Sequence, residues 1–196
     1  MYGFERVGTS CGTISANAAA SVDSGVFWMG KRGFFAYTGG AVQSLPCEVG
    51  DYVFSDINPD QATKVSCTIN GAWNEIWWFY PSENSVECDR YVIYDYAENI
   101  WSTGLIDRTA GVDAGVFRKP MFIAPSGVLY EHEIGHDYGD STPYAETGPI
   151  AIGAGDQVMR VTSLIPDERT QGEVQATFKT RFYPNAAETD YGPFTM

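Results

Sequence analysis

The sequence contains few basic residues. It has 12 Lys and Arg against 25 Asp and Glu, which gives a formal net charge of −13. A protein that binds the phosphates of nucleic acids over a large surface needs Lys and Arg in excess. The composition therefore argues against a large phosphate-binding surface, and we expect no sequence-specific nucleic-acid binding. The acidic surface favours solubility and resists non-specific association.

Long apolar runs and paired cysteines are also missing. No run approaches the roughly 18 to 20 apolar residues that span a bilayer, so we expect no membrane span. None of the cysteines forms a C-x-x-C pair, which argues against a zinc knuckle. We expect free, buried thiols at all four positions: Cys11, Cys47, Cys67 and Cys88.

Helical patterns are scarce as well. The Ala-rich stretch at residues 15–24 is the best candidate for a helix, and it is short. Aromatic residues make up 14% of the chain, alongside 21 Gly and 10 Pro, a composition typical of many short strands joined by tight turns. With 44% hydrophobic residues, the chain can build a proper core.

Histidine occurs only twice, and both residues lie in the run His132-Glu133-Ile134-Gly135-His136. This run matches the H-E-x-x-H pattern, in which two His one helical turn apart bind Zn²⁺ and the Glu polarises a water. A catalytic zinc also needs a third protein ligand. Thr142 stands where the longer form of the pattern has a third His, so a carboxylate such as Glu146 or Asp156 would have to complete the site.

The residues around this run favour a hairpin over a helix. Residues 121–124 and 128–130 are apolar runs separated by Pro-Ser-Gly, which is a hairpin signal. Downstream, Gly135, Gly139 and Pro143 would break a helix within two turns. We therefore interpret the run as a strand that ends in a polar loop with solvated histidines, and we assign no catalytic, cofactor-binding or metal-binding residue.

The same strand–turn–strand pattern recurs along the chain. Its three instances span residues 25–37, 75–95 and 119–131. Their equivalent aromatic residues lie about 45 to 50 residues apart, the period of repeated four-stranded blades. The repeat predicts a propeller-like array of antiparallel blades.

The stretch VIYDYAENIWST, residues 92–103, resembles the end of a kelch-type blade. Asp95 is expected to accept backbone N–H bonds in the turn, next to Asn99. Trp101 supplies a large flat surface for packing between neighbouring sheets. This resemblance implies an architecture and not the function of kelch proteins, and Gly39-Gly40 does not sit where the kelch double glycine would.

The pattern changes near residue 148. Residues 174–183 alternate between apolar and polar side chains, as expected of a half-buried strand that ends before Pro184. Residues 191–196 could form a last edge strand. We predict an all-β fold, with a partial or incomplete propeller at residues 1–147 and a C-terminal β segment at 148–196 that is either the last blade or a docking segment.

Several stretches together resemble the β-propeller tail proteins of short-tailed bacteriophages, of the packaged-DNA stabilisation and tail-nozzle type. They are VFWMGKRGFFAYTGGAVQSLPC, YVIYDYAENIWSTG, GVLYEHE and AIGAGDQVMRVTSLIPDERTQGEVQATFKTRFYPN leading into YGPF. The resemblance covers roughly residues 4 to 195.

The resemblance implies a structural virion protein without catalytic residues or cofactors. Such a protein would form a homo-oligomer around the tail axis, contact portal-adapter or other tail proteins, and be assembled in the host cytoplasm. At about 45 residues per blade, the chain is too short for a closed ring of five or more blades. We therefore expect a fragment, or a chain that needs neighbours to complete its sheets.

Two other functions remain open. One is a propeller module that binds a host glycan, which would show an exposed aromatic platform flanked by Asp or Asn. The other is the zinc metalloprotease, which requires a helix over residues 130–140. Some of the five tryptophans are expected to be interface anchors and at least half to be core: Trp28, Trp73, Trp77, Trp78 and Trp101.

Overall fold

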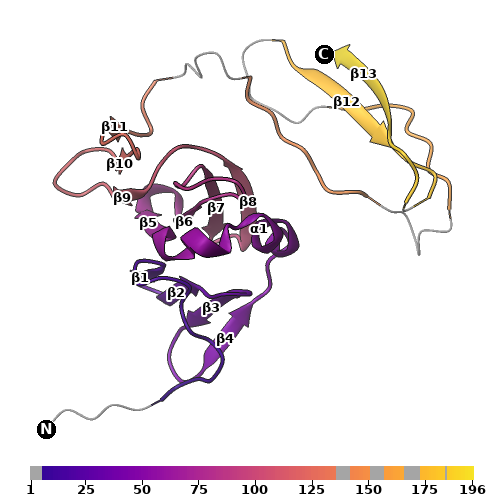
Figure 1. Cartoon of the computed structure of the whole chain (residues 1–196). Helices are drawn as coiled ribbons and strands as arrows, with labels where there is room; N and C mark the ends of the chain where they lie inside the picture. Colours follow the sequence, from indigo (N-terminus) through magenta and orange to yellow (C-terminus); the bar gives the residue numbers. More distant parts are fainter. Residues whose placement is uncertain (1–5, 136–141, 151–156, 166–172, 184) are drawn as a thin grey trace, which may run out of the picture. The chain divides into compact units, whose positions relative to one another are not determined.

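A computed structural model describes residues 6–135, 142–150, 157–165, 173–183 and 185–196. These residues form two compact units, Met1–Asp137 and Tyr138–Met196, and each unit is described by itself (Figure 1). The boundary between the units lies ten residues before the division at 147/148 that the sequence suggested. Strands far outnumber helices among the described residues, as the predicted all-β class requires.

The first unit contains three antiparallel sheets in which consecutive strands are neighbours. Sheet 1 consists of β1 (Ala19–Val22), β2 (Gly25–Met29), β3 (Phe34–Tyr37) and β4 (Val42–Leu45). Sheet 2 consists of β5 (Ser66–Asn70), β6 (Glu75–Tyr80), β7 (Arg90–Asp95) and β8 (Ile100–Leu105). Sheet 3 consists of β9 (Ala110–Val112), β10 (Met121–Ile123) and β11 (Leu129–Glu131). The three predicted hairpins are confirmed as β2–β3, β6–β7 and β10–β11.

The helices lie between these strands. They are α1 (Gly50–Asp56) and two short 3₁₀ helices, η1 (Pro59–Lys64) and η2 (Gly71–Trp73). The helix expected at residues 15–24 is wrong, because β1 occupies this stretch. Ala20 pairs with Phe27 and is buried, so ladder pairing and core packing override the weak helix preference of alanine.

The main core lies between sheets 1 and 2. Trp78 of β6 is fully buried, and its indole N–H donates to the Ala18 carbonyl at 2.9 Å. The Phe34 ring of β3 lies 5.1 Å from the Trp78 ring and 4.6 Å from the Trp101 ring. Trp101 of β8 donates to the carbonyl of Pro46 at 2.9 Å. The predicted role of Trp101 between neighbouring sheets is thereby confirmed.

A second, smaller core lies between sheets 2 and 3. Trp77 lies on the opposite face of β6 from Trp78, because the side chains of successive strand residues point to opposite faces of the sheet. Its ring lies 5.6 Å from Phe122 of β10, and Phe79 lies 5.5 Å from the same ring. The two adjacent tryptophans thus place sheet 2 between sheets 1 and 3.

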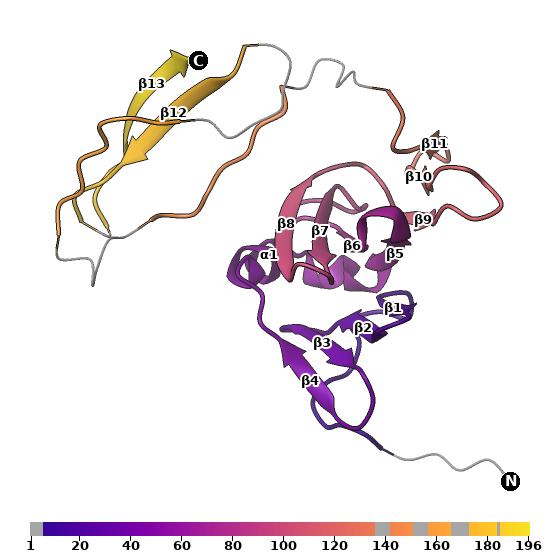
Figure 2. The same ribbon diagram turned by 180° about the vertical axis from the view of Figure 1, so that it is seen from behind.

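The first strands of the three sheets lie side by side, as both views show (Figures 1 and 2). Asn17, just before β1, forms a parallel bridge with Ser66, and its carbonyl accepts from the amide of Cys67 at 2.8 Å. The Ser66 hydroxyl donates to the carbonyl of Thr109, just before β9. The edge strands β1, β5 and β9 of the three sheets are therefore neighbours.

The second unit contains one hairpin, β12 (Gln175–Thr180) and β13 (Thr189–Thr195). Both the predicted alternation and the predicted last strand are confirmed. Ala176 and Phe178 are partly buried while their neighbours in β12 are exposed, and Phe178 lies 6.2 Å from Phe194. The described residues of this unit form two paired strands and not a four-stranded blade.

Candidate functional site

The H-E-x-x-H run follows the β10–β11 hairpin. Strand β11 ends at Glu131, and residues 132–135 are not helical. Glu133 has φ +59°, outside the range of a right-handed helix. The helix that a zinc site of this type needs is therefore not formed over residues 132–135. His136 and Asp156 lie outside the described residues, and Glu146 binds Lys179 in the second unit at 2.7 Å.

His132 was expected to be solvated, and this expectation is wrong. Its ring is partly buried, 4.1 Å from the ring of Phe122, because the hairpin brings it against the second core. Its Nε2 accepts a hydrogen bond from Arg108 Nε at 3.1 Å. Burial and, next, the charge of Arg108 lower the pKa of His132, while Glu133 partly raises it.

Arg108 is a buried cation that gave no recognisable signal in the sequence. Only 9% of it is exposed. Its Nη1 donates to the Asp107 carboxylate at 2.5 Å, and its guanidinium carbon lies 3.8 Å from the centre of the Tyr130 ring. These contacts connect the segment before β9 to β11, so the part of the run that is described belongs to the packing of sheet 3.

A second polar cluster joins sheet 2 to the loop after β11. Asn70 is 1% exposed, and its Nδ2 donates to Glu75 at 3.3 Å and to Glu133 at 3.2 Å. The Trp77 indole donates to the same Glu75 carboxylate at 2.8 Å. Burial and the neighbouring charges of Glu133 and Asp95 raise the pKa of Glu75 against the effect of the Trp77 and Asn70 hydrogen bonds. The described residues hold no group of three or more His, Cys, Asp or Glu side chains that could bind a metal ion.

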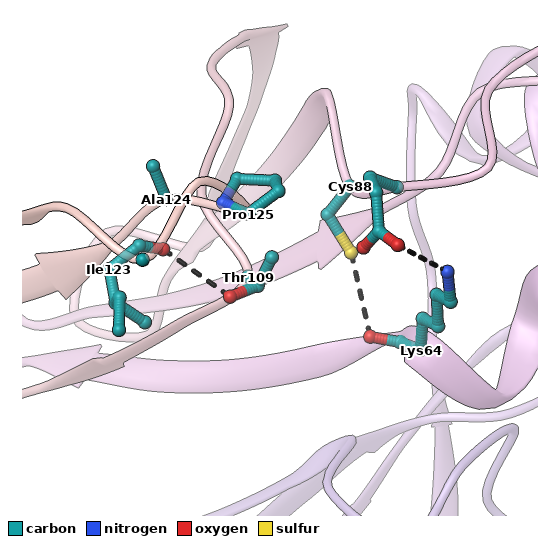
Figure 3. Close-up of a pocket in the computed structure, with 8 residues that line it drawn as sticks. Lys64, Cys88, Thr109, Ile123, Ala124 and Pro125 are labelled. Carbon is teal, nitrogen blue, oxygen red and sulfur yellow. Dashed lines mark hydrogen bonds and ion pairs between the residues drawn. The ribbon is translucent and has the colours of Figure 1, made fainter.

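A pocket of about 410 Å³ lies between the segment before β7 and the turn after β10 (Figure 3). One wall is apolar, from the β10–β11 turn. The other carries the ion pair of Lys64 Nζ with Glu87 at 2.5 Å, whose side chains are 38% and 47% exposed. The lining residues are Lys64, Glu87, Cys88, Thr109, Ile123, Ala124, Pro125 and Gly127. His132 and Glu133 are not among them.

Cys88 is the one cysteine among the residues that line this pocket, and its surroundings keep its thiol protonated. Burial, with smaller contributions from Glu87 and Asp89, raises its pKa to about 12. Its thiol donates to the Lys64 carbonyl at 3.5 Å. Because the thiolate is the reactive form, this Cys is chemically inert near neutral pH. The pocket can accept an apolar group, but its geometry offers no activated nucleophile.

The four cysteines are free, as expected. Burial was expected for all of them, and only Cys88 is fully buried, while Cys11, Cys47 and Cys67 are partly buried. Cys67 faces the main core, and burial raises its pKa to about 12.

The tryptophans divide between core and surface. Trp78 and Trp101 are buried, Trp28 and Trp77 are partly buried, and Trp73 of η2 is 60% exposed. The backbone next to Trp73 is held by Asp113, whose carboxylate accepts from the Gly71 amide at 3.1 Å. Trp73 with this carboxylate is the feature of the described surface that best fits a stacking platform.

No family model matches the chain, and no curated protein matches its sequence. In the described part of the chain, no helix has the length and apolar character needed to cross a membrane.

Proposed function

We propose that the chain is a structural component of a bacteriophage tail or neck and that it acts through assembly and not through catalysis. In this proposal sheets 1, 2 and 3 are blades of an incomplete β-propeller. The observation that carries it is the stack of three antiparallel sheets whose first strands, β1, β5 and β9, lie side by side. Blades of a propeller are arranged around a common axis in this way.

The phage assignment comes from the sequence resemblance, and the charge of the chain supports it. A tail or nozzle subunit that stabilises packaged DNA lines or plugs a channel through which DNA later moves. A protein with a net charge of −13 repels phosphates and so does not hold the DNA it conducts. The proposed partners are further copies of the chain around the tail axis and the portal-adapter or other tail proteins. The proposed location is the virion, after assembly in the host cytoplasm.

This function is tested on purified phage particles. Quantitative mass spectrometry should find the chain in DNA-filled particles at a fixed copy number, and antibody labelling should place it at the tail or neck. Particles made without the chain should lose their packaged DNA. A chain that remains in the lysate and is absent from particles would refute the proposal.

A glycan-binding module is the second candidate, and the 60% exposed Trp73 favours it. Sugar rings stack on exposed aromatic faces, and carboxylates such as Asp113 bind sugar hydroxyls. A glycan array would show binding that Trp73→Ala abolishes. Tyr52→Ala is the matched control because Tyr52 is 53% exposed on α1. Equal binding by both variants, or no binding at all, excludes this candidate.

A further inference from the structure

Each face of sheet 2 is covered by a neighbouring sheet of the same chain. We call the face toward the preceding sheet the back face and the face toward the following sheet the front face. The back face carries Trp78, which the front face of sheet 1 covers with Phe34. The front face carries Trp77, which the back face of sheet 3 covers with Phe122. Both internal interfaces therefore join a front face to a back face.

The back face of sheet 1 is the first face without such a neighbour among the described residues of its unit. Trp28 and Phe35 pair across β2 and β3, and their rings stack at 5.8 Å with an interplanar angle of 24°. They point away from the main core, which takes Phe27 and Phe34 from the same strands. Trp28 occupies the second strand of its sheet, as Trp78 does in sheet 2. Its indole N–H donates to the Cys11 carbonyl at 2.7 Å, while the ring remains partly exposed.

The front face of sheet 3 is the second such face. Met121 pairs with Val112, and Ile123 pairs with Leu129, on the side opposite the buried Phe122. Val112 is 52% exposed and Leu129 is 56% exposed. Glu131 pairs with Met121 and is exposed on the same side, so this face is an apolar surface with one carboxylate, on a short three-stranded sheet.

We propose that a second copy of the chain covers these faces, with the front face of sheet 3 in one copy packed on the back face of sheet 1 in the next. The contact has the same arrangement as the two interfaces inside each chain, in which the front face of one sheet packs on the back face of the next. In the proposed contact the aromatic back face of sheet 1 packs against the apolar front face of sheet 3. Each copy offers one face of each kind, so the contact is head-to-tail. Repeated head-to-tail contacts give a ring when the rotation closes. This inference deepens the proposed function, on which it rests, by naming the surfaces that assemble.

Charged substitutions on the two faces test the contact in the full chain. The front variant is Val112→Glu with Leu129→Glu, and the back variant is Ala19→Glu with Ser44→Glu. Ala19 and Ser44 are exposed and pair with Trp28 and Phe35. An unpaired carboxylate in an apolar interface is strongly unfavourable, so each variant alone should be monomeric by light scattering.

The control variant is Val116→Glu, because Val116 is 99% exposed and lies between β9 and β10, outside both faces. It should form the same oligomer as the unchanged chain. Unchanged urea unfolding of each variant shows that the sheets remain folded.

Mixing the two monomeric variants identifies the geometry. The front variant keeps an intact back face and the back variant keeps an intact front face, so the mixture should form a 1:1 heterodimer and nothing larger. An unchanged chain that is monomeric at high concentration refutes the inference, as does an oligomer that neither variant disrupts. In that case another segment of the polypeptide, or a different protein, covers these faces.

The outcome is separable from that of the proposed function. If neither variant disrupts the oligomer while the chain is found in phage particles at a fixed copy number, the contact is refuted while the tail function stands. If the contact forms but the chain is absent from particles, the tail function is refuted while the contact stands.

Discussion

At the scale of single residues, Trp78 in β6 and Trp73 in η2, just before that strand, occupy opposite environments. Trp78 has no exposed surface and donates to the Ala18 carbonyl, while Trp73 is 60% exposed. Trp78→Phe keeps an aromatic ring but removes one of the two donors to the Ala18 carbonyl, which also accepts from the Met29 amide at 3.0 Å, and it shrinks a fully buried side chain. We expect a loss of about 1 to 3 kcal/mol in the free energy of unfolding.

Trp73→Phe is the matched control, and it should change that free energy by less than about 0.5 kcal/mol. Urea denaturation followed by circular dichroism measures both variants. Equal losses would show that Trp78 does not bridge sheets 1 and 2.

His132 should make the stability depend on pH. Its pKa is lowered from 6.5 by burial and by Arg108, so the folded chain binds the proton less tightly than the unfolded chain. The free energy of unfolding therefore falls as the pH drops from about 6.5 toward the lower pKa of the folded state. His132→Gln keeps an acceptor for Arg108 but does not titrate, so this variant should lose less stability between about pH 7.5 and pH 5.5.

Urea unfolding of both proteins at the two pH values measures this difference. Glu75, whose pKa is raised, contributes with the opposite sign but is present in both proteins. Parallel pH profiles would show that His132 is solvated in the folded protein.

Residue environments were only partly predictable from the sequence. The opposite directions of Trp77 and Trp78 follow from strand alternation alone. The burial of His132 and Arg108 does not, because it depends on how sheet 3 packs on sheet 2, and no local pattern records that contact. The H-E-x-x-H pattern did not predict the conformation of its own backbone, because the hairpin before it determines that conformation.

At the scale of elements, the turn between β7 and β8 was predicted in detail. Asp95 accepts from the amides of Ala97 at 2.8 Å and Glu98 at 3.0 Å, while Asn99 has φ +58° and accepts from the Tyr94 hydroxyl at 2.7 Å. Asp95→Ala removes both turn bonds and should cost about 1 kcal/mol. Asp95→Asn retains an acceptor and should cost less.

Thermal unfolding of these two variants tests the turn. The melting temperature of Asp95→Ala should lie below that of Asp95→Asn. Equal losses in both variants relative to the unchanged chain would show that the negative charge of Asp95, and not its acceptor oxygen, stabilises the turn.

Hairpins were predictable because both of their strands and the turn lie close together in the sequence. The helix α1 was missed for the opposite reason. Its 7 residues are too few for a helical repeat to be recognised, and it is held by the burial of Val53 in the main core. The strand at Ala19–Val22 was also missed, since alanine favours helix and only pairing with β2 makes it a strand.

At the scale of the whole first unit, the order of the sheets follows from which face of each strand is apolar. Sheet 2 has large aromatic residues on both faces and so lies between two neighbours. Sheets 1 and 3 each have one such neighbour in the described chain. The same rule that places sheet 2 inside the stack leaves an apolar face at each end, and the proposed assembly uses these two faces.

Ionic strength should then govern the assembly in a defined direction. Copies with a net charge of −13 repel one another, while the proposed contact joins the face that carries Trp28 to the face that carries Leu129 and is apolar apart from Glu131. Salt screens the repulsion and does not weaken apolar burial, so the oligomer fraction should rise between about 0.02 M and 0.5 M NaCl. Light scattering at fixed protein concentration measures it, with Val116→Glu as control. A fraction that falls with salt would mean that opposite charges hold the copies together, and the apolar end faces would then not be the contact.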